Sequence, residues 1–200
     1  MILRFHNFIS PNVITASCSP NPDSCGGTGG CGGATAEIAF DYVASSSGLD
    51  QEFQLPYLSY NGENYACPAI SAPVATIGGY IKLPENNYTA LMTAIATVGP
   101  IAVSVDASGW GAYEGGIYTY WNKEAPVINH AVVLVGYGEE GGQKYWTIRN
   151  SWSPSWGEAG YIRLARSDDD ELNCGIGKKC LFHSCLFVLL PFRCFNINRH

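Results

Sequence analysis

The stretch that decides the fold lies between residues 129 and 161. It reads NHAVVLVGYG at residues 129–138, EEGGQK at residues 139–144 and YWTIRNSWSPSWGEAGY at residues 145–161. Two runs of β-branched and aromatic residues flank a charged segment with two glycines, the pattern of two antiparallel strands joined by a tight turn. An aromatic loop bounded by glycine follows the second run. The stretch therefore predicts the centre of a strand-rich domain.

Outward from this stretch, further short segments rich in β-branched and aromatic residues predict more strands. They are separated by glycine, proline and charged turns, as in a small antiparallel barrel. Residues 88–98 (YTALMTAIATV) instead repeat apolar positions at helical spacing and stop at Gly99-Pro100, which predicts a helix. The additional predicted strands are residues 101–107, 116–120 and 160–166.

The N-terminal part of the chain has a different composition. Residues 17–33 hold almost only turn-forming residues and cysteines, and residues 34–45 (ATAEIAFDYVAS) predict an amphipathic helix. We therefore expect a helical domain over residues 1–80 and a strand domain over residues 81–180. Residues 181–200 form an apolar tail, but its apolar stretch, residues 181–192, is short of the about 20 residues that span a bilayer. They read as a buried tail, a membrane-surface segment or non-native sequence from a misread gene end, of which we favour the last.

Composition and cysteine usage limit the function classes. A chain of 200 residues with 46% hydrophobic and 14% charged residues is globular, and a net charge of −6 argues against nucleic-acid binding. Eight cysteines indicate either disulfides or a zinc site. Their wide spacing and the scattered histidines favour disulfides, so we expect no metal. A disulfide-rich chain needs export, yet Arg4 and His6 interrupt any signal peptide. We therefore expect the natural N-terminus to lie upstream of Met1.

Two residues in the deciding stretch could form an acid–base group and the residue that orients it. His130 opens an apolar strand, and Asn150 follows another strand at the start of the aromatic loop. An imidazole can take the proton of a cysteine thiol and return it to a leaving amine. A carboxamide can orient that imidazole without adding a charge. A lone histidine beside an apolar run is more often structural, so the pair persuades only in combination with the motifs around it.

These motifs resemble those of the papain family of cysteine proteases, in its cathepsin L group. The two segments quoted above, GPIAVSVD at residues 99–106, GGIY at residues 115–118 and GCGGA at residues 30–34 occur in the order in which the family carries them. The resemblance extends over roughly residues 10–180. It implies an α+β fold of two domains, an incomplete helical left domain and an antiparallel β-barrel right domain.

The resemblance also implies roles for individual residues. His130 matches the catalytic histidine and Asn150 its orienting asparagine, while Trp152 and Trp156 match tryptophans that shield this pair. The second glycine of the family's G-C-x-G-G segment is replaced here by Ala34, and Thr35 and Ala36 fall in the wall of the main specificity pocket. The residues implied to bind substrate are Gly32, Gly33, Ala34, Thr35, Ala36, Asn129 and Ala131.

One catalytic residue of the family has no counterpart in this sequence. The nucleophile lies in a C-G-S-C-W-type segment about 130–150 residues before the histidine, which here falls at or before Met1. The glutamine that serves the oxyanion hole lies just before it and is absent too. Cys25 and Cys31 lie in the glycine-rich loop without such neighbours, so neither is expected to replace the nucleophile.

The resemblance also sorts the cysteines. It pairs Cys18 with Cys67, and it matches Cys31 to a half-cystine whose partner would lie beside the absent nucleophile. Cys174 matches another half-cystine without its usual partner, for which Cys180 is a substitute. Cys31 is then expected to be unpaired or mispaired with Cys25. The pairing of Cys25, Cys31, Cys185 and Cys194 stays open.

The resemblance implies a cysteine endopeptidase that cleaves peptide bonds through a thioester, without a cofactor. We expect an N-terminally truncated chain that is inactive alone. It should fold poorly without the missing central helix, with the strand domain left intact. The alternatives are a protease-shaped binding protein without activity and a structural or storage protein. The expected partners are peptide or protein substrates and cystatin-like or propeptide inhibitors. We expect a monomer in a lysosomal or extracellular compartment.

Overall fold

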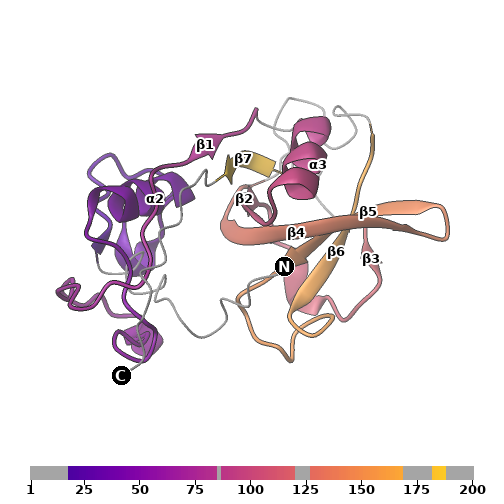
Figure 1. Ribbon diagram of the computed structural model, residues 1–200. Helices are drawn as coiled ribbons and strands as arrows, with labels where there is room; N and C mark the ends of the chain where they lie inside the picture. The colour runs from indigo at the N-terminus through magenta and orange to yellow at the C-terminus, as the bar shows by residue number, and fades with distance from the viewer. Residues whose placement is uncertain (1–17, 85–86, 120–126, 169–181, 188–200) are drawn as a thin grey trace, which may run out of the picture. The chain divides into compact units, whose positions relative to one another are not determined.

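The computed structural model describes residues 18–84, 87–119 and 127–168, and the backbone of a strand at residues 182–187. The chain divides into two compact units: the described residues up to Tyr80 belong to the first, and the second spans Ile81–Phe187 (Figure 1). Among the described residues, no helix has the length and apolar character that crossing a membrane would require.

The described part of unit 1, residues 18–80, contains one α-helix. Helix α2 (Ala36–Ser45) follows a short 3-10 helix, η2 (Gly30–Gly32), and a second short 3-10 helix, η3 (Ser59–Asn61), comes later in the unit. Val43 and Ile77 form a buried apolar cluster in this unit, and Phe40, Tyr42 and Leu49 pack against them. This apolar cluster is small, so covalent and polar links contribute much of the unit's order.

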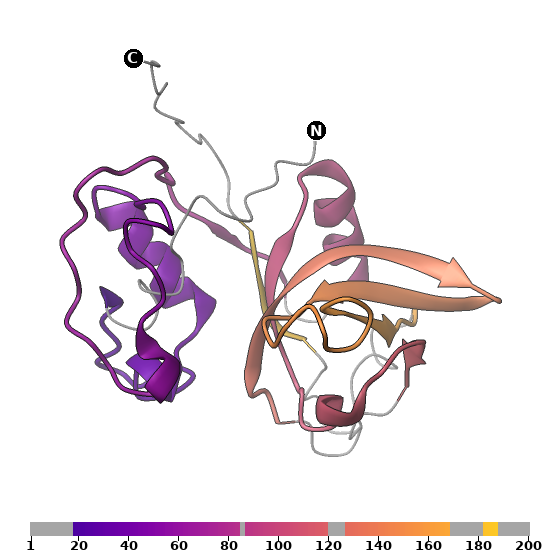
Figure 2. The same ribbon diagram turned by 90° about the horizontal axis from the view of Figure 1, so that it is seen from below.

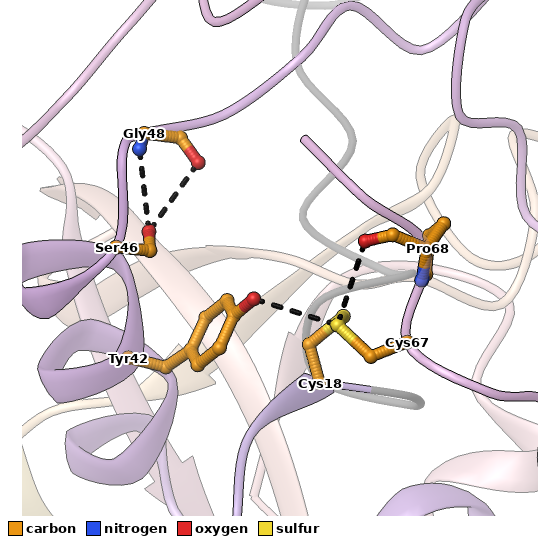
Figure 3. The surroundings of a disulfide bond; sticks show 6 residues. All are labelled: Cys18, Tyr42, Ser46, Gly48, Cys67 and Pro68. Atoms are coloured by element: carbon orange, nitrogen blue, oxygen red, sulfur yellow. Dashed lines mark hydrogen bonds between the residues drawn. A yellow bond between two sulfur atoms is a disulfide. The ribbon is translucent and has the colours of Figure 1, made fainter. Parts of the chain in front are cut away.

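The covalent link is a disulfide between Cys18 and Cys67, the pairing that the family resemblance implies (Figure 3). It joins the glycine-rich loop before α2 to the segment beyond η3. The hydroxyl of Tyr42, on α2, lies 3.5 Å from Cys67 Sγ. Because a disulfide sulfur carries no proton, the hydroxyl is the donor in this contact. Loop and helix therefore meet at the disulfide.

Unit 2 is a seven-stranded sheet. Its strand order is β1-β7-β2-β4-β5-β6-β3, so the strand last in sequence lies between β1 and β2. Neighbouring strands are antiparallel except β3 and β6, which are parallel. The strands are β1 (Ile81–Lys82), β2 (Ile101–Val105), β3 (Ile117–Tyr118), β4 (His130–Glu140), β5 (Gln143–Arg149), β6 (Tyr161–Ala165) and β7 (Phe182–Phe187).

Helix α3 (Tyr88–Thr97) packs against one face of this sheet (Figure 2). Its start is capped by Asn87, whose Oδ1 accepts the N–H of Ala90 at 2.8 Å. Leu91 and Ala94 point into a core made with alternate residues of the strands, as period-two burial requires. The core residues are Leu91, Ala94, Ile101, Val103, Val105, Ala107, Trp110, Tyr113, Val132, Leu134, Trp146, Ile148, Ile162 and Leu164.

The long β4–β5 hairpin follows from its turn residues. Gly141 and Gly142 have φ of 58° and 80°, the positive values that a tight two-residue hairpin turn needs. The register shifts between Leu134 and Gly136, where β4 carries one residue more than its partner. Such a bulge bends a strand.

The α+β fold expected from the sequence is confirmed, and most predicted elements agree with the structure to within a few residues. Two features differ from the expectation. The β3–β6 pair is parallel within a sheet that was expected to be antiparallel throughout. Strand β7 falls in residues 181–200, where the sequence predicted a tail and no strand. Tyr120, the predicted end of one strand, lies outside the described residues.

Candidate active site

His130 is the first residue of β4, where it pairs with Val105 of β2. Its ring is half-buried, and its Nε2 lies 2.8 Å from Oδ1 of Asn150. Asn150 comes directly after β5, the next strand in the sheet, and its own N–H donates to the carbonyl of Gly160 at 2.9 Å. Two adjacent strands thus bring together the histidine and asparagine that are 20 residues apart in sequence.

The backbone fixes the orientation of the Asn150 amide. Its Oδ1 also accepts the N–H of Ser151 at 2.8 Å. If the amide were flipped, its NH₂ would face that N–H donor, so the oxygen must face Ser151 and therefore His130. An oxygen facing Nε2 requires a proton on Nε2, which leaves the lone pair of the neutral ring on Nδ1. The imidazole is thus held in the tautomer that accepts a proton through Nδ1.

Three tryptophans surround this pair. The ring of Trp152 lies 5.1 Å from the His130 ring at a tilt of 33°, and Trp110 meets His130 edge-on at 6.1 Å. Trp156 stacks on Trp110 and donates its Nε1–H to the Trp110 carbonyl at 3.2 Å. Trp110 is only 1% exposed, whereas Trp152 is 43% exposed. The Asn150 side chain, in a residue 8% exposed, therefore bonds to His130 in surroundings with little water, which strengthens a hydrogen bond.

The loop that carries two of these tryptophans is held from its far end. Gly157 has φ of 54°, and a Cβ there would lie 2.7 Å from the Tyr161 carbonyl and 2.8 Å from the Tyr113 ring. The position therefore requires glycine. Glu158 accepts hydrogen bonds from the Arg163 guanidinium at 2.8 and 2.6 Å and from the Gly116 N–H at 2.9 Å. The bonds to Arg163, helped by the one from Gly116, outweigh burial and lower the pKa of Glu158.

Asn129 and Ala131, the predicted neighbours of the histidine, differ in what they contact. Asn129 donates its N–H to the Val105 carbonyl and accepts the Ala107 N–H on Oδ1, each at 3.0 Å. Ala131 is exposed, since it points away from the core side of β4. Both lie beside His130 in unit 2.

The other predicted substrate-binding residues, Gly32 to Ala36, lie in unit 1. Gly33 has φ of 88°, a conformation that side chains disfavour, and Ala34 is not among the residues with positive φ. Alanine is thus compatible with the backbone at that position. Thr35 is the N-cap residue of α2, and Ala36 begins the helix.

Cys25 and Cys31, which are not expected to replace the nucleophile, are free and exposed in unit 1. The Sγ of Cys31 donates to the Glu63 carbonyl at 3.4 Å, and its N–H donates to Asn64 Oδ1. Neither contact provides a base. The positions of Cys174, Cys180 and Cys194 lie outside the described residues, as does the Cys185 side chain. Within the described ranges, no group of three or more His, Cys, Asp or Glu side chains is placed to hold a metal ion.

Comparison with known proteins identifies the family. Residues 10–184 match the family described as Papain family cysteine protease. The chain belongs to the papain family. Among curated papain-family relatives, cathepsin K of Mus musculus is 42% identical over 156 residues, which are 76% of this chain and 46% of that protein. Digestive cysteine proteinase 2 of Homarus americanus is 39% identical over 153 residues, which are 75% of this chain and 46% of that protein. The chain thus spans about half the length of these relatives.

Solved papain-family structures match the fold. Bromelain from Ananas comosus, in complex with the E64 inhibitor, superposes with a TM-score of 0.72 at 30% identity, covering 92% of this chain and 78% of that chain. Procathepsin L2 from the Tenebrio molitor larval midgut superposes with a TM-score of 0.75 at 32% identity, covering 93% and 54%. These matches and the cathepsin relatives agree with the cathepsin L-type resemblance of the sequence.

Sequence reasoning missed Trp110 in this papain-family chain. Trp152 and Trp156 were singled out because they match family tryptophans in the segment after Asn150, whereas Trp110 lies 20 positions before His130 in a loop outside the matched motifs. The signal was an aromatic residue among glycines directly after an apolar strand, where a large side chain has little local reason to occur. Trp110 is the buried member of the cluster and the one on which the other two rings pack.

Proposed function

We propose that this chain carries the acid–base half of a cysteine endopeptidase site. The observation that carries the proposal is the 2.8 Å contact between His130 Nε2 and Asn150 Oδ1, with the amide oriented by the N–H of Ser151. This arrangement leaves His130 Nδ1 as the proton acceptor. Family membership supports the assignment, since the papain family consists of cysteine peptidases.

In this proposal His130 Nδ1 takes the proton of a cysteine thiol, and the resulting thiolate attacks the carbonyl carbon of a peptide bond. The imidazolium then returns the proton to the leaving amine as the thioester forms. Water, deprotonated by the same nitrogen, hydrolyses the thioester. Asn150 keeps the imidazole in place through both steps. Trp152 and Trp156 limit the access of water to the hydrogen bond between His130 and Asn150.

The nucleophile belongs, in this proposal, to a segment of a longer protein that precedes Met1. No C-G-S-C-W-type segment occurs in the 200 residues, and the alignment with mouse cathepsin K covers 46% of the length of that protein. The chain alone is then inactive, and the longer protein cleaves peptide or protein substrates as a monomer controlled by a propeptide or cystatin-like inhibitors. The Cys18–Cys67 disulfide favours a lysosomal or extracellular compartment. The residues proposed to bind the substrate backbone and side chain are Gly32, Gly33, Ala34, Thr35, Ala36, Asn129 and Ala131.

The transcript upstream of Met1 tests this proposal. We expect it to encode an in-frame segment of the C-G-S-C-W type, and the longer protein to hydrolyse peptide substrates in a way that thiol alkylation stops. His130→Ala then lowers kcat by at least about 10²-fold, the usual contribution of a general acid–base residue. Asn150→Ala has a smaller effect in the same direction.

An in-frame stop codon directly upstream contradicts the proposal and favours the binding protein without activity. The 200-residue chain provides the control, since it should hydrolyse nothing. Hydrolysis by that chain which Cys25→Ser or Cys31→Ser abolishes would show that the nucleophile has been placed wrongly.

A further inference from the structure

A buried carboxylate directly after β2 has no part in the acid–base chemistry described so far. Asp106 is 6% exposed. It accepts hydrogen bonds from the Ser108 N–H at 2.9 Å and the Ser108 hydroxyl at 2.5 Å on Oδ1, and from the Val127 N–H at 2.9 Å on Oδ2. Burial alone would raise its pKa, but these three bonds outweigh burial and lower it, so the group is ionised at neutral pH.

The same serine connects Asp106 to the residue before the histidine. Because the Ser108 hydroxyl gives its proton to Asp106, its oxygen is free to accept, and Nδ2 of Asn129 donates to it at 3.0 Å. Asn129 is also bonded to the backbone of Val105 and Ala107. A continuous series of bonds therefore runs from Asn129 through Ser108 to Asp106.

These bonds join the end of β2 to the start of β4. The Val127 N–H and the Asn129 side chain belong to the segment that enters β4, whereas Asp106 and Ser108 belong to the segment that leaves β2. The first residue of a strand is followed, but not preceded, by a residue held in the sheet, so its position depends on such cross-links. That first residue is His130.

We propose that Asp106 is a positioning residue for His130, acting through Ser108 and Asn129 to hold the start of β4 so that His130 Nε2 stays aligned with Asn150 Oδ1. The inference rests on the proposed function, because it concerns the same base. Burial of the carboxylate explains why the link is rigid: an ionised group that is out of water keeps its hydrogen bonds, since losing one leaves a charge unsatisfied.

NMR of the ¹⁵N-labelled 200-residue chain can measure this alignment. The signal to follow is the His130 Nε2 proton, which exchanges slowly only while it is bonded to Asn150 Oδ1. In the wild type we expect a slowly exchanging Nε2 proton and the Nε2–H tautomer as the main neutral form. Ser108→Ala removes the hydroxyl bridge at an exposed position, and Ser108→Thr keeps it. Asp106→Asn places an NH₂ group against an N–H donor, whichever way the amide turns.

We expect Ser108→Ala and Asp106→Asn to lose the Nε2 signal or to exchange it at least tenfold faster, and Ser108→Thr to retain it. Asp50→Asn is the matched control. Asp50 is a buried carboxylate in unit 1 that accepts the Ser71 N–H and hydroxyl and the Ala72 N–H. It should leave the His130 signal unchanged.

The proposal is overturned if the His130 Nε2 proton exchanges at the wild-type rate in both Ser108→Ala and Asp106→Asn. It is also overturned if Asp50→Asn loses the Nε2 signal to the same extent, because the effect would then be one of overall stability. Indole fluorescence shows whether unit 2 remains folded. If Asp106→Asn unfolds it, Ser108→Ala decides alone. The readout needs no substrate, so failure of the peptidase assay leaves this test intact, and failure of this test leaves the peptidase assay intact.

Discussion

Trp110 and Trp152 contact the same histidine, yet they should contribute very differently to stability. A fully buried tryptophan removes about 150–250 Å² from water, which at about 25 cal/mol per Å² corresponds to about 4–6 kcal/mol. Trp110 is 1% exposed and approaches this limit. Measured Trp→Ala changes in cores cost about 3–5 kcal/mol, and we expect Trp110→Ala to fall in that range.

Trp152 is 43% exposed, so its truncation removes only roughly half as much buried area as the truncation of Trp110. We expect Trp152→Ala to cost at least about 1 kcal/mol less than Trp110→Ala. The effect on His130 should be in the opposite order. Trp152 lies nearer to the ring and more nearly face to face, so its removal should shift the His130 ring proton resonances more.

Urea unfolding followed by indole fluorescence measures the first effect. All five tryptophans lie between residues 110 and 156, so the signal reports unit 2 without a contribution from unit 1. Midpoints are compared at constant m, because a change in m would indicate a change in the denatured state. A cost below about 1 kcal/mol for Trp110→Ala, or equal costs for the two variants, refutes the reasoning from burial.

Three further outcomes follow from contacts described above. The pKa of Glu158 is lowered in the folded state, chiefly by its bonds to Arg163, so its contribution to stability is present above the ordinary value of 4.5 and is lost as pH falls below it. Glu158→Gln should therefore lower the free energy of unfolding of unit 2 by about 1 kcal/mol at pH 7 and by almost nothing at acid pH. A variant whose urea midpoint has the same pH dependence as that of the wild type contradicts this. Reducing the Cys18–Cys67 disulfide, which spans 49 residues, should destabilise unit 1 by about 2–4 kcal/mol; hydrogen exchange of residues 36–45 measures this, with unit 2 fluorescence as the unchanged control. Asn87→Ala should lower the stability of unit 2 by about 1 kcal/mol while Asn87→Asp keeps the cap, and equal unfolding midpoints for the two variants argue against the capping role.

Local pattern was enough to predict most of the elements. Helix α3 and strands β2, β4, β5 and β6 each have a period and an end signal within their own residues, such as Gly99-Pro100 after α3. The pairing of strands is less accessible to sequence. Residues 182–187 read as an apolar tail because their partners in the sheet, β1 and β2, lie about 80–100 residues earlier, and no local signal records that pairing.

The candidate site was predictable to the extent that motifs carry it. His130 and Asn150 were selected through the segments around them, and their contact adds what no motif states, namely which nitrogen of the ring bears the proton. Asp106 and Trp110 act through residues distant in sequence, by a hydrogen bond to Val127 and by ring contacts with His130. Such contacts depend on the register of β2 against β4, which the sequence leaves open.

The sheet order also has a consequence for the sequence of events in folding. Glu140 and Gln143 pair across a two-residue turn, so the β4–β5 hairpin can close within microseconds, whereas β7 must find β2 across about 80 intervening residues. His130 and Asn150 lie at the open end of that hairpin, 20 residues apart. We therefore expect His130 and Asn150 to come together early, because the loop between their two strands is the shortest one to close. Strand β7 then joins last, and its first residue, Phe182, pairs with Val105, the β2 residue whose other partner is His130.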